Sequence, residues 1–284
     1  MADITIAAIL RAGAYSPNHI GNDAAILNMA ADQLRKRGCV VNIYSEEQFA
    51  AGGAADEPTI INMCREPRSI ELLQQAEDDG RLVINSGYAI ENCIRERMTR
   101  IIVGSNIPFP DSKVVNTNMV VKDALASAGI SRCWIKRADF HAQHKEDVSY
   151  ARNPEEAQEL VQEYFLRGIS RAVIQRHIDG ELIQFYGITD SPFFFWFFPM
   201  HAAQKPSAEL GESIDSRLRG IASTAATELG LNIYGGECIL SADGTLTLID
   251  VNDWPSFAPC RPEAATAIAK SVIATIKTRR QPIS

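Results

Sequence analysis

Short apolar runs alternate with amphipathic stretches over the first third of the chain. The apolar, β-branched runs have the length of strands and lie at residues 4–10, 40–44, 59–63 and 82–85. Helical periodicity fills residues 23–37 and 69–79, and a glycine follows each stretch. Strands that alternate with helices predict a parallel, Rossmann-like α/β sheet over about residues 1–105. No G-x-G-x-x-G follows the first run, so a dinucleotide site is not expected.

The pattern changes after residue 105. Short strands are predicted at 113–115 and 133–137, and helices at 118–128 and 154–166. Two Asp-Gly pairs predict antiparallel hairpins, one joining 172–178 to 181–187 and the other joining 237–242 to 245–251. A helix with one apolar stripe lies between the hairpins, and a last helix covers about 263–278. This order predicts an α+β region with antiparallel sheets behind the α/β front.

Composition narrows the class of protein. The 284 residues are 46% hydrophobic and 22% charged with a net charge of -7, which excludes disordered and collagen-like chains and argues against a nucleic-acid-binding surface. The six aromatics at 193–198 are too few for a membrane span of roughly 20 residues, so they predict a buried strand. No basic region precedes the first apolar run, and six scattered cysteines form no C-x-x-C pair, so we expect a cytoplasmic protein with reduced core cysteines.

The second hairpin carries the first chemical signal. A two-residue turn at Asp243-Gly244 puts Glu237 opposite Asp250, and Asn252, two residues on, points to the same face. Two carboxylates and an amide oxygen at one place make a hard oxygen site that suits Mg²⁺. The alternative is that Asp250 and Asn252 only end a strand and cap a loop.

The segment from Glu237 to Pro255, ECILSADGTLTLIDVNDWP, resembles the metal-binding end of the ATP-grasp superfamily. There an acidic residue on one strand and an acid-x-Asn on the next hold the magnesium ions bound to ATP. Three further stretches are similar to other parts of that family in the same order, namely VINSGYAIENCIRERMTRIIVGSNIPFPDSKVV, CWIKRAD and AVIQRHIDGELIQFYGI. The resemblance therefore covers essentially the whole chain.

The resemblance implies a role for individual residues. Glu237, Asp250 and Asn252 would bind Mg²⁺, while Lys136 and Arg95, which stands where the family usually has lysine, would contact the ATP phosphates. Adenine would lie against the hinge made by Gln175, Arg176, His177 and Ile178. The ribose acid would be Glu181 or Asp179. One departure concerns the phosphate-covering loop, because the segment 138–147 contains no glycine.

The acceptor pocket is defined less sharply. Arg11 and Arg65 follow predicted strand ends, where α/β folds bind ligands. An arginine at such a place can bind a carboxylate or a phosphate. The alternative is that both arginines form surface salt bridges. Gln184 stands where several relatives have a substrate-contacting basic residue. Ser256 and Arg261, just beyond the metal strand, are further candidates to face the acceptor, and Arg261 is a candidate catalytic residue.

The implied domains are an N-terminal domain at 1–105, a small lid subdomain at 106–180 and a metal- and substrate-binding subdomain at 181–284. The implied activity is a Mg²⁺- and ATP-dependent ligase that joins a carboxylate to an amine through an acylphosphate. The alternatives are a small-molecule kinase similar to inositol trisphosphate 5/6-kinase, and a nucleotide-binding protein without turnover. The expected partners are ATP and a small carboxylate or hydroxyl acceptor, without nucleic acid or membrane; a homodimer is left open.

Overall fold

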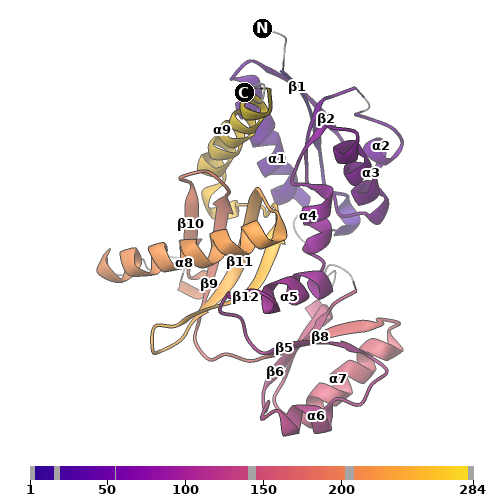
Figure 1. The fold of residues 1–284 in the computed structure, drawn as a ribbon, viewed down its shortest axis with the longest axis vertical. Helices are drawn as coiled ribbons and strands as arrows, with labels where there is room; N and C mark the ends of the chain where they lie inside the picture. Colours follow the sequence, from indigo (N-terminus) through magenta and orange to yellow (C-terminus); the bar gives the residue numbers. More distant parts are fainter. Residues whose placement is uncertain (1–3, 16–19, 55, 140–144, 202–207, 281–284) are drawn as a thin grey trace.

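Three four-stranded sheets build the molecule (Figure 1). The computed structural model describes residues 4–15, 20–54, 56–139, 145–201 and 208–280. Sheet A lies at the end of the molecule that holds both termini, sheet C lies in the middle and sheet B lies at the opposite end (Figure 1). Helices α4 (Gly87–Asn92) and α5 (Arg95–Val103) lead the chain from sheet A to sheet B.

Sheet A is the parallel front of the chain. Its strands are β1 (Ile4–Ile9), β2 (Cys39–Tyr44), β3 (Thr59–Asn62) and β4 (Leu82–Ile84), in the order β2-β1-β3-β4. Every neighbouring pair runs parallel. The helices of this region are α1 (Ile20–Arg35), α2 (Glu46–Ala50) and α3 (Pro67–Asp78). The parallel α/β front predicted from the alternating pattern is therefore confirmed.

Sheet B is antiparallel and small. Its order is β5-β8-β6-β7, with β5 (Ser112–Asn116), β6 (Cys133–Arg137), β7 (Val148–Ala151) and β8 (Arg171–Arg176). Helices α6 (Lys122–Ser127) and α7 (Pro154–Leu166) belong to it, and α6 is shorter than predicted. The buried side chains of Ala157, Val161 and Tyr164 place the apolar stripe of α7 in the core of this sheet.

Sheet C is also antiparallel, in the order β10-β9-β11-β12. Its strands are β9 (Glu181–Ile188), β10 (Phe194–Phe197), β11 (Ile233–Leu240) and β12 (Leu246–Asp253). One face is covered by α8 (Ala208–Leu229), whose predicted stripe is buried at Ile214, Leu218, Ala222, Ala225 and Leu229. The other face is partly open and carries the chemistry described below.

The first predicted hairpin is wrong. β8 and β9 flank Asp179-Gly180 but lie in different sheets. Both edges of β8 are occupied by β5 and β6, and both edges of β9 by β10 and β11, so neither strand has a free edge for the other. The Asp179 carboxylate pairs with Arg132 at the end of sheet B. The Asp-Gly pair therefore marks the crossing between two sheets.

The aromatic run forms a strand as predicted, but the expected burial is wrong. All four residues of β10 are only half-buried. β10 pairs with β9 alone and forms the edge of sheet C, so its outer side has no neighbouring strand. An aromatic strand of this kind leaves ring surface accessible next to the open face of the sheet.

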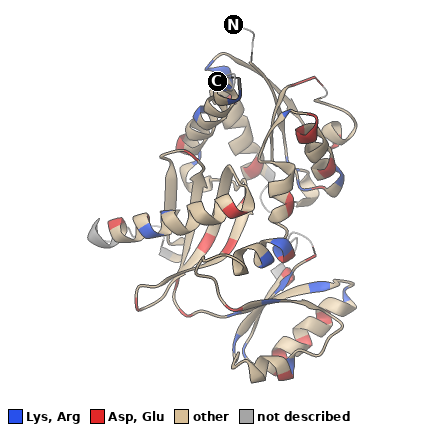
Figure 2. Cartoon of the chain, in the orientation of Figure 1, with Lys and Arg blue, Asp and Glu red and all other residues tan. Residues whose placement is uncertain are grey.

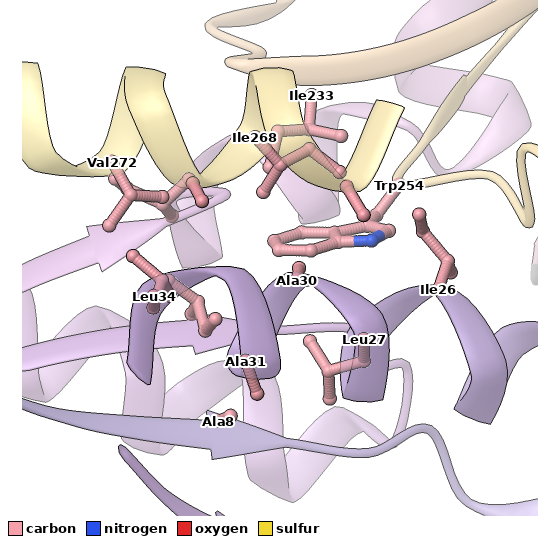
Figure 3. Packing of buried hydrophobic residues seen from close by; sticks show 14 of the residues in the cluster. Ala8, Ile26, Leu27, Ala30, Ala31, Leu34, Ile233, Trp254, Ile268 and Val272 are labelled. Atoms are coloured by element: carbon pink, nitrogen blue, oxygen red, sulfur yellow. The ribbon is translucent and has the colours of Figure 1, made fainter. Parts of the chain in front are cut away.

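The last helix, α9 (Arg261–Arg280), returns to the start of the chain and packs on α1 (Figures 1 and 3). Trp254, fully buried at the end of β12, lies between these helices against Ala30 and Ile268 (Figure 3). All six cysteines are buried and free. Among the described helices, none combines the length and the apolar character that crossing a membrane requires. The shared core joins sheet A to the end of sheet C.

Candidate functional site

The β11–β12 pair brings Glu237 opposite Asp250, as predicted. The predicted turn is not the reason. Ser241 pairs with Thr245, which shifts the strands by one residue, and a bulge between Glu237 and Cys238 restores the register toward the strand ends. Asn252 follows Asp250 on the same face. Ile249 has no partner in the β11–β12 register, and its carbonyl oxygen accepts hydrogen bonds from Lys136 Nζ and Gln175 Nε2.

Two carboxylates of this hairpin share one environment. Burial, and then the Asp250 charge, raise the pKa of Glu237, while a hydrogen bond from Gln184 Nε2 to Glu237 Oε1 (3.0 Å) holds the carboxylate in place. Two carboxylates and the Asn252 amide fit Mg²⁺. This ion is commonly bound by one or two carboxylates, while water and phosphate supply the other oxygen ligands. Within the described residues, no cluster of three or more His, Cys, Asp or Glu side chains is arranged for a metal, so an all-protein cage is not expected.

Two cations face the carboxylates. The ammonium of Lys136, on β6, donates to Ile249 O at 3.2 Å, and Arg95 Nη2, at the start of α5, lies 3.3 Å from Asp250 Oδ2. Figure 2 shows basic positions on α5 beside acidic positions on the strands of sheet C. Burial lowers the pKa of Lys136 to about 8, against the opposing effect of Asp250. A buried ammonium next to carboxylates is a binding group for phosphate oxygens.

A cavity of about 280 Å³ opens between sheets B and C beside these charges. Lys136 and Gln175 line it from sheet B, and Glu237 lines it from sheet C. Its remaining walls are mostly apolar side chains and the crossing between the sheets, formed by Trp134, Val148, Arg176, His177, Ile178, Gly180, Leu182, Ile239 and Ile249. A mostly apolar cavity with Lys136 and Glu237 in its wall suits a ligand that combines an apolar ring with charged groups.

The hinge between the sheets was predicted at Gln175, Arg176, His177 and Ile178. Gln175 pairs with the neighbouring strands of sheet B, and the next two residues are also held by backbone hydrogen bonds. The N–H groups of Arg176 and His177 donate to Asp111 O and Arg132 O at 2.9 and 3.0 Å. The Arg176 guanidinium turns away to Asp111 and to the end of α6, and the imidazole of His177 accepts from Trp134 Nε1 at 3.1 Å. In the described part of the chain, the Ile178 N–H has no acceptor. Among the described hinge residues, this amide is available to donate to a ligand.

The predicted acceptor arginines lie in a closed network at the junction of sheets A and C. Arg65 Nη2 donates to Asp253 Oδ1 at 2.7 Å, and Arg11 donates to Asp23 at 2.8 Å and to Trp254 O at 3.2 Å. The Asp253 side chain is 1% exposed, and those of Arg11 and Arg65 are 8% and 11% exposed. The structure thus engages both arginines with the protein, in a buried form of the salt-bridge alternative.

The remaining predicted residues spread around the open face. Glu181 is exposed at the start of β9, and Asp179 is engaged by Arg132 and His177. Arg261 Nε donates to Ser256 O at 3.4 Å and its Nη2 to Asn22 at 2.9 Å. Most of the central part of the glycine-free segment 138–147 lies outside the described residues, namely residues 140–144. The metal, phosphate and hinge positions come together, whereas Arg11 and Arg65 lie apart from them.

Several residues in and near the site were not predicted from the sequence. Trp134 and Ile239 stand two positions from Lys136 and Glu237, so strand alternation places them on the same faces and could have found them. Asn85 is fully buried and clamps β4 to β11 through both hydrogen bonds to the Ile233 backbone, at 2.7 and 2.8 Å. No local signal marks such a residue, because its partner lies far along the chain.

Comparison with known proteins supports the architecture. No family model matches the sequence, and no curated protein matches it either. Among solved structures, a D-alanine–D-alanine ligase from Bacillus anthracis complexed with ATP is similar with a TM-score of 0.70 at 13% identity, covering 98% of this chain and 100% of that one. A RimK domain ATP-grasp protein from Sphaerobacter thermophilus has a TM-score of 0.67 at 16% identity, covering 95% and 99%.

The ATP-grasp ligase PsnB, in a complex with precursor peptide PsnA2 and AMPPNP, is similar with a TM-score of 0.64 at 14% identity, covering 97% of this chain and 99% of that one. The likeness thus extends over nearly the full length of all three chains. The chain has the ATP-grasp fold, and the fold class expected from its motifs is confirmed.

Proposed function

We propose that the chain is an ATP-dependent ligase that joins a carboxylate to an amine with the help of Mg²⁺. The observation that carries the proposal is one cluster: Glu237, Asp250 and Asn252 share a face of the β11–β12 pair, Arg95 pairs with Asp250, and Lys136 and Glu237 line the same cavity. This cluster lies on a fold that the chain shares with ATP-grasp ligases.

Each residue has a role in holding ATP. Lys136 and Arg95 bind phosphate oxygens, the Ile178 N–H donates to adenine, and Glu181 accepts from the ribose. Glu237, Asp250 and Asn252 hold Mg²⁺, which when bound neutralises phosphate charge in the reaction. The Gln184 amide fixes the orientation of Glu237. These groups position ATP and neutralise the charge of its phosphates. Phosphoryl transfer requires little covalent chemistry from a protein.

The proposed reaction has two steps. A carboxylate oxygen of the substrate bonds to the γ-phosphorus as the bond to ADP breaks, which gives an acylphosphate. An amine then bonds to the acyl carbon, inorganic phosphate leaves with the bonding electrons, and the amine loses a proton. Arg261 and Ser256, beyond β12, are proposed to face this acceptor side.

Hydroxylamine provides the test, because it replaces an unknown amine and converts an acylphosphate to a hydroxamate. Purified protein would be incubated with Mg²⁺, ATP, hydroxylamine and a panel of carboxylic acids and polyols, and both ADP and hydroxamate would be measured. The proposal expects ADP and hydroxamate in equal amounts with at least one acid. ADP release with a polyol alone would favour a kinase, and nucleotide binding without ADP release would favour a protein without turnover.

A further inference from the structure

The open face of sheet C changes character from one edge to the other. At β12 and β11 it carries Asp250 and Glu237, and the register then sets Gln184 beside Glu237 and Phe197 beside Gln184. Two residues along β9, Tyr186 pairs with Phe195. Residues directly opposite or two positions apart on adjacent strands share one face. The metal-binding end therefore passes directly into a row of aromatic rings.

These rings form one surface, which we call the aromatic wall: Tyr186, Phe195, Phe197 and Phe257. The ring centroid of Tyr186 lies 6.4 Å from that of Phe195, 6.1 Å from Phe197 and 5.1 Å from Phe257. Phe257 is fully buried and forms the back of the wall, whereas the three rings on β9 and β10 are only half-buried. Their exposed ring surface lies on the side of the sheet that carries Glu237.

Two further features shape the wall. A Cβ at Gly235 would lie 2.8 Å from Pro255 and 2.9 Å from Tyr186, so the glycine lets both rings approach the strand between Tyr186 and Asn252. The positions of β9 and β10 on this face carry no charged side chain; they are Leu182, Gln184, Tyr186, Ile188, Phe195 and Phe197. The nearby Arg11 and Arg65 are engaged with Asp23 and Asp253. This part of sheet C thus presents aromatic rings. A substrate with a second anionic group would instead require cations at these positions.

We infer that the carboxylic acid substrate carries an aromatic group that packs on the aromatic wall while its carboxylate lies toward Glu237 and the phosphates. This inference rests on the proposed function and names the substrate class of the same site. The two ends of such a molecule match the two ends of the face, since rings prefer offset or edge contacts with rings, and Lys136 and Arg95 lie against the end of the face that the reacting carboxylate would reach. A small or dianionic acid satisfies only one of the two ends.

The test compares two monocarboxylic acids and one dicarboxylic acid by calorimetry on the full chain with Mg²⁺, both with and without AMPPNP. The probes are 3-phenylpropionate, butyrate and glutarate. The inference expects 3-phenylpropionate to bind about tenfold to a hundredfold more tightly than butyrate, the range that apolar pockets reach by discriminating size. Equal affinities, tighter binding of glutarate, or binding of none of the three would overturn it.

Variants on two faces of one strand locate the effect. Phe195→Leu, within the wall, should reduce the preference for 3-phenylpropionate over butyrate at least fivefold. Phe194→Leu is the matched control, because Phe194 lies on the opposite face against Phe185 and under the Arg219 guanidinium, and it should keep the preference. Circular dichroism checks that both variants fold. If both variants lost the preference equally, the wall would not be the binding surface.

The nucleotide arm separates this inference from the proposed function. Failure of AMPPNP to bind with Mg²⁺ would count against the proposed function, whatever the acids do. Tight AMPPNP binding without a preference for the phenyl acid would leave the proposed function standing and overturn the aromatic substrate. The hydroxamate assay with the same three acids gives the corresponding result in turnover.

Discussion

Two clusters of cations and carboxylates lie three residues apart in the second half of β12, and they have opposite characters. Asp253 is enclosed by Arg65 and Arg11 and is 1% exposed. Asp250, three residues earlier, is also paired with an arginine, yet it lies opposite Glu237, which lines a cavity together with Lys136. Residue type alone does not distinguish them. The difference is that protein groups satisfy the first cluster, whereas the second presents charges to a space that a ligand can enter.

The largest expected effect concerns the closed cluster. Asp253→Ala removes the carboxylate that pairs with the buried Arg65 guanidinium, and breaking a buried pair from one side costs about 3–5 kcal/mol. We therefore expect a loss of that size in the free energy of unfolding, measured by urea denaturation. Asp250→Ala is the matched control and should lose less than about 1 kcal/mol, because its partner Arg95 also donates to Arg137 O. Equal losses would contradict the distinction between the clusters.

The next effect concerns the open cluster. Lys136→Ala removes a charge-assisted contact to phosphate, which is worth about 1.5–3 kcal/mol, so AMPPNP affinity should fall about tenfold to a hundredfold. Calorimetric titration measures it. Arg137→Ala, the next residue on β6, alters a side chain that is paired with Asp139 and should leave the affinity within about twofold. An unchanged affinity in Lys136→Ala would remove the lysine from the site.

The two clusters also differ in how well the sequence predicts them. The pairing of Glu237 with Asp250 was predicted correctly, but the two-residue turn and the actual bulge reach the same register by different routes. The convergence of Glu237 with Asp250 was readable because strand alternation defines it. The engagement of Arg11 by Asp23, and the separation of β8 from β9, depend on which strands already occupy the sheet edges, and no local pattern records that.

A smaller effect follows from pH. Burial lowers the pKa of Lys136 to about 8, below that of an exposed lysine, so the free protein loses this proton as the pH rises through that value. A bound phosphate requires the charged form, and nucleotide binding must then take up a proton. AMPPNP affinity should be about tenfold weaker at pH 9 than at pH 7.

Lys136→Arg is the control for this pH dependence, since an arginine stays charged throughout this range. The variant should show a flat affinity between pH 7 and pH 9. The sign is opposite for folding: between pH 8 and the ordinary lysine pKa of 10.5, the unfolded chain holds a proton that the folded chain has released, so this lysine destabilises the fold less as the pH rises. Affinity that is independent of pH in the unaltered protein would show that Lys136 does not meet the phosphates.

The most direct test of the central claim is the Mg²⁺ dependence of AMPPNP binding in the unaltered protein and in Asp250→Asn. The account predicts that Mg²⁺ strengthens binding to the unaltered protein at least tenfold, and that Asp250→Asn keeps its fold and its affinity without Mg²⁺ but loses most of this gain. An undiminished Mg²⁺ effect in Asp250→Asn would contradict the assignment of the open cluster as the place where the nucleotide and its metal are held.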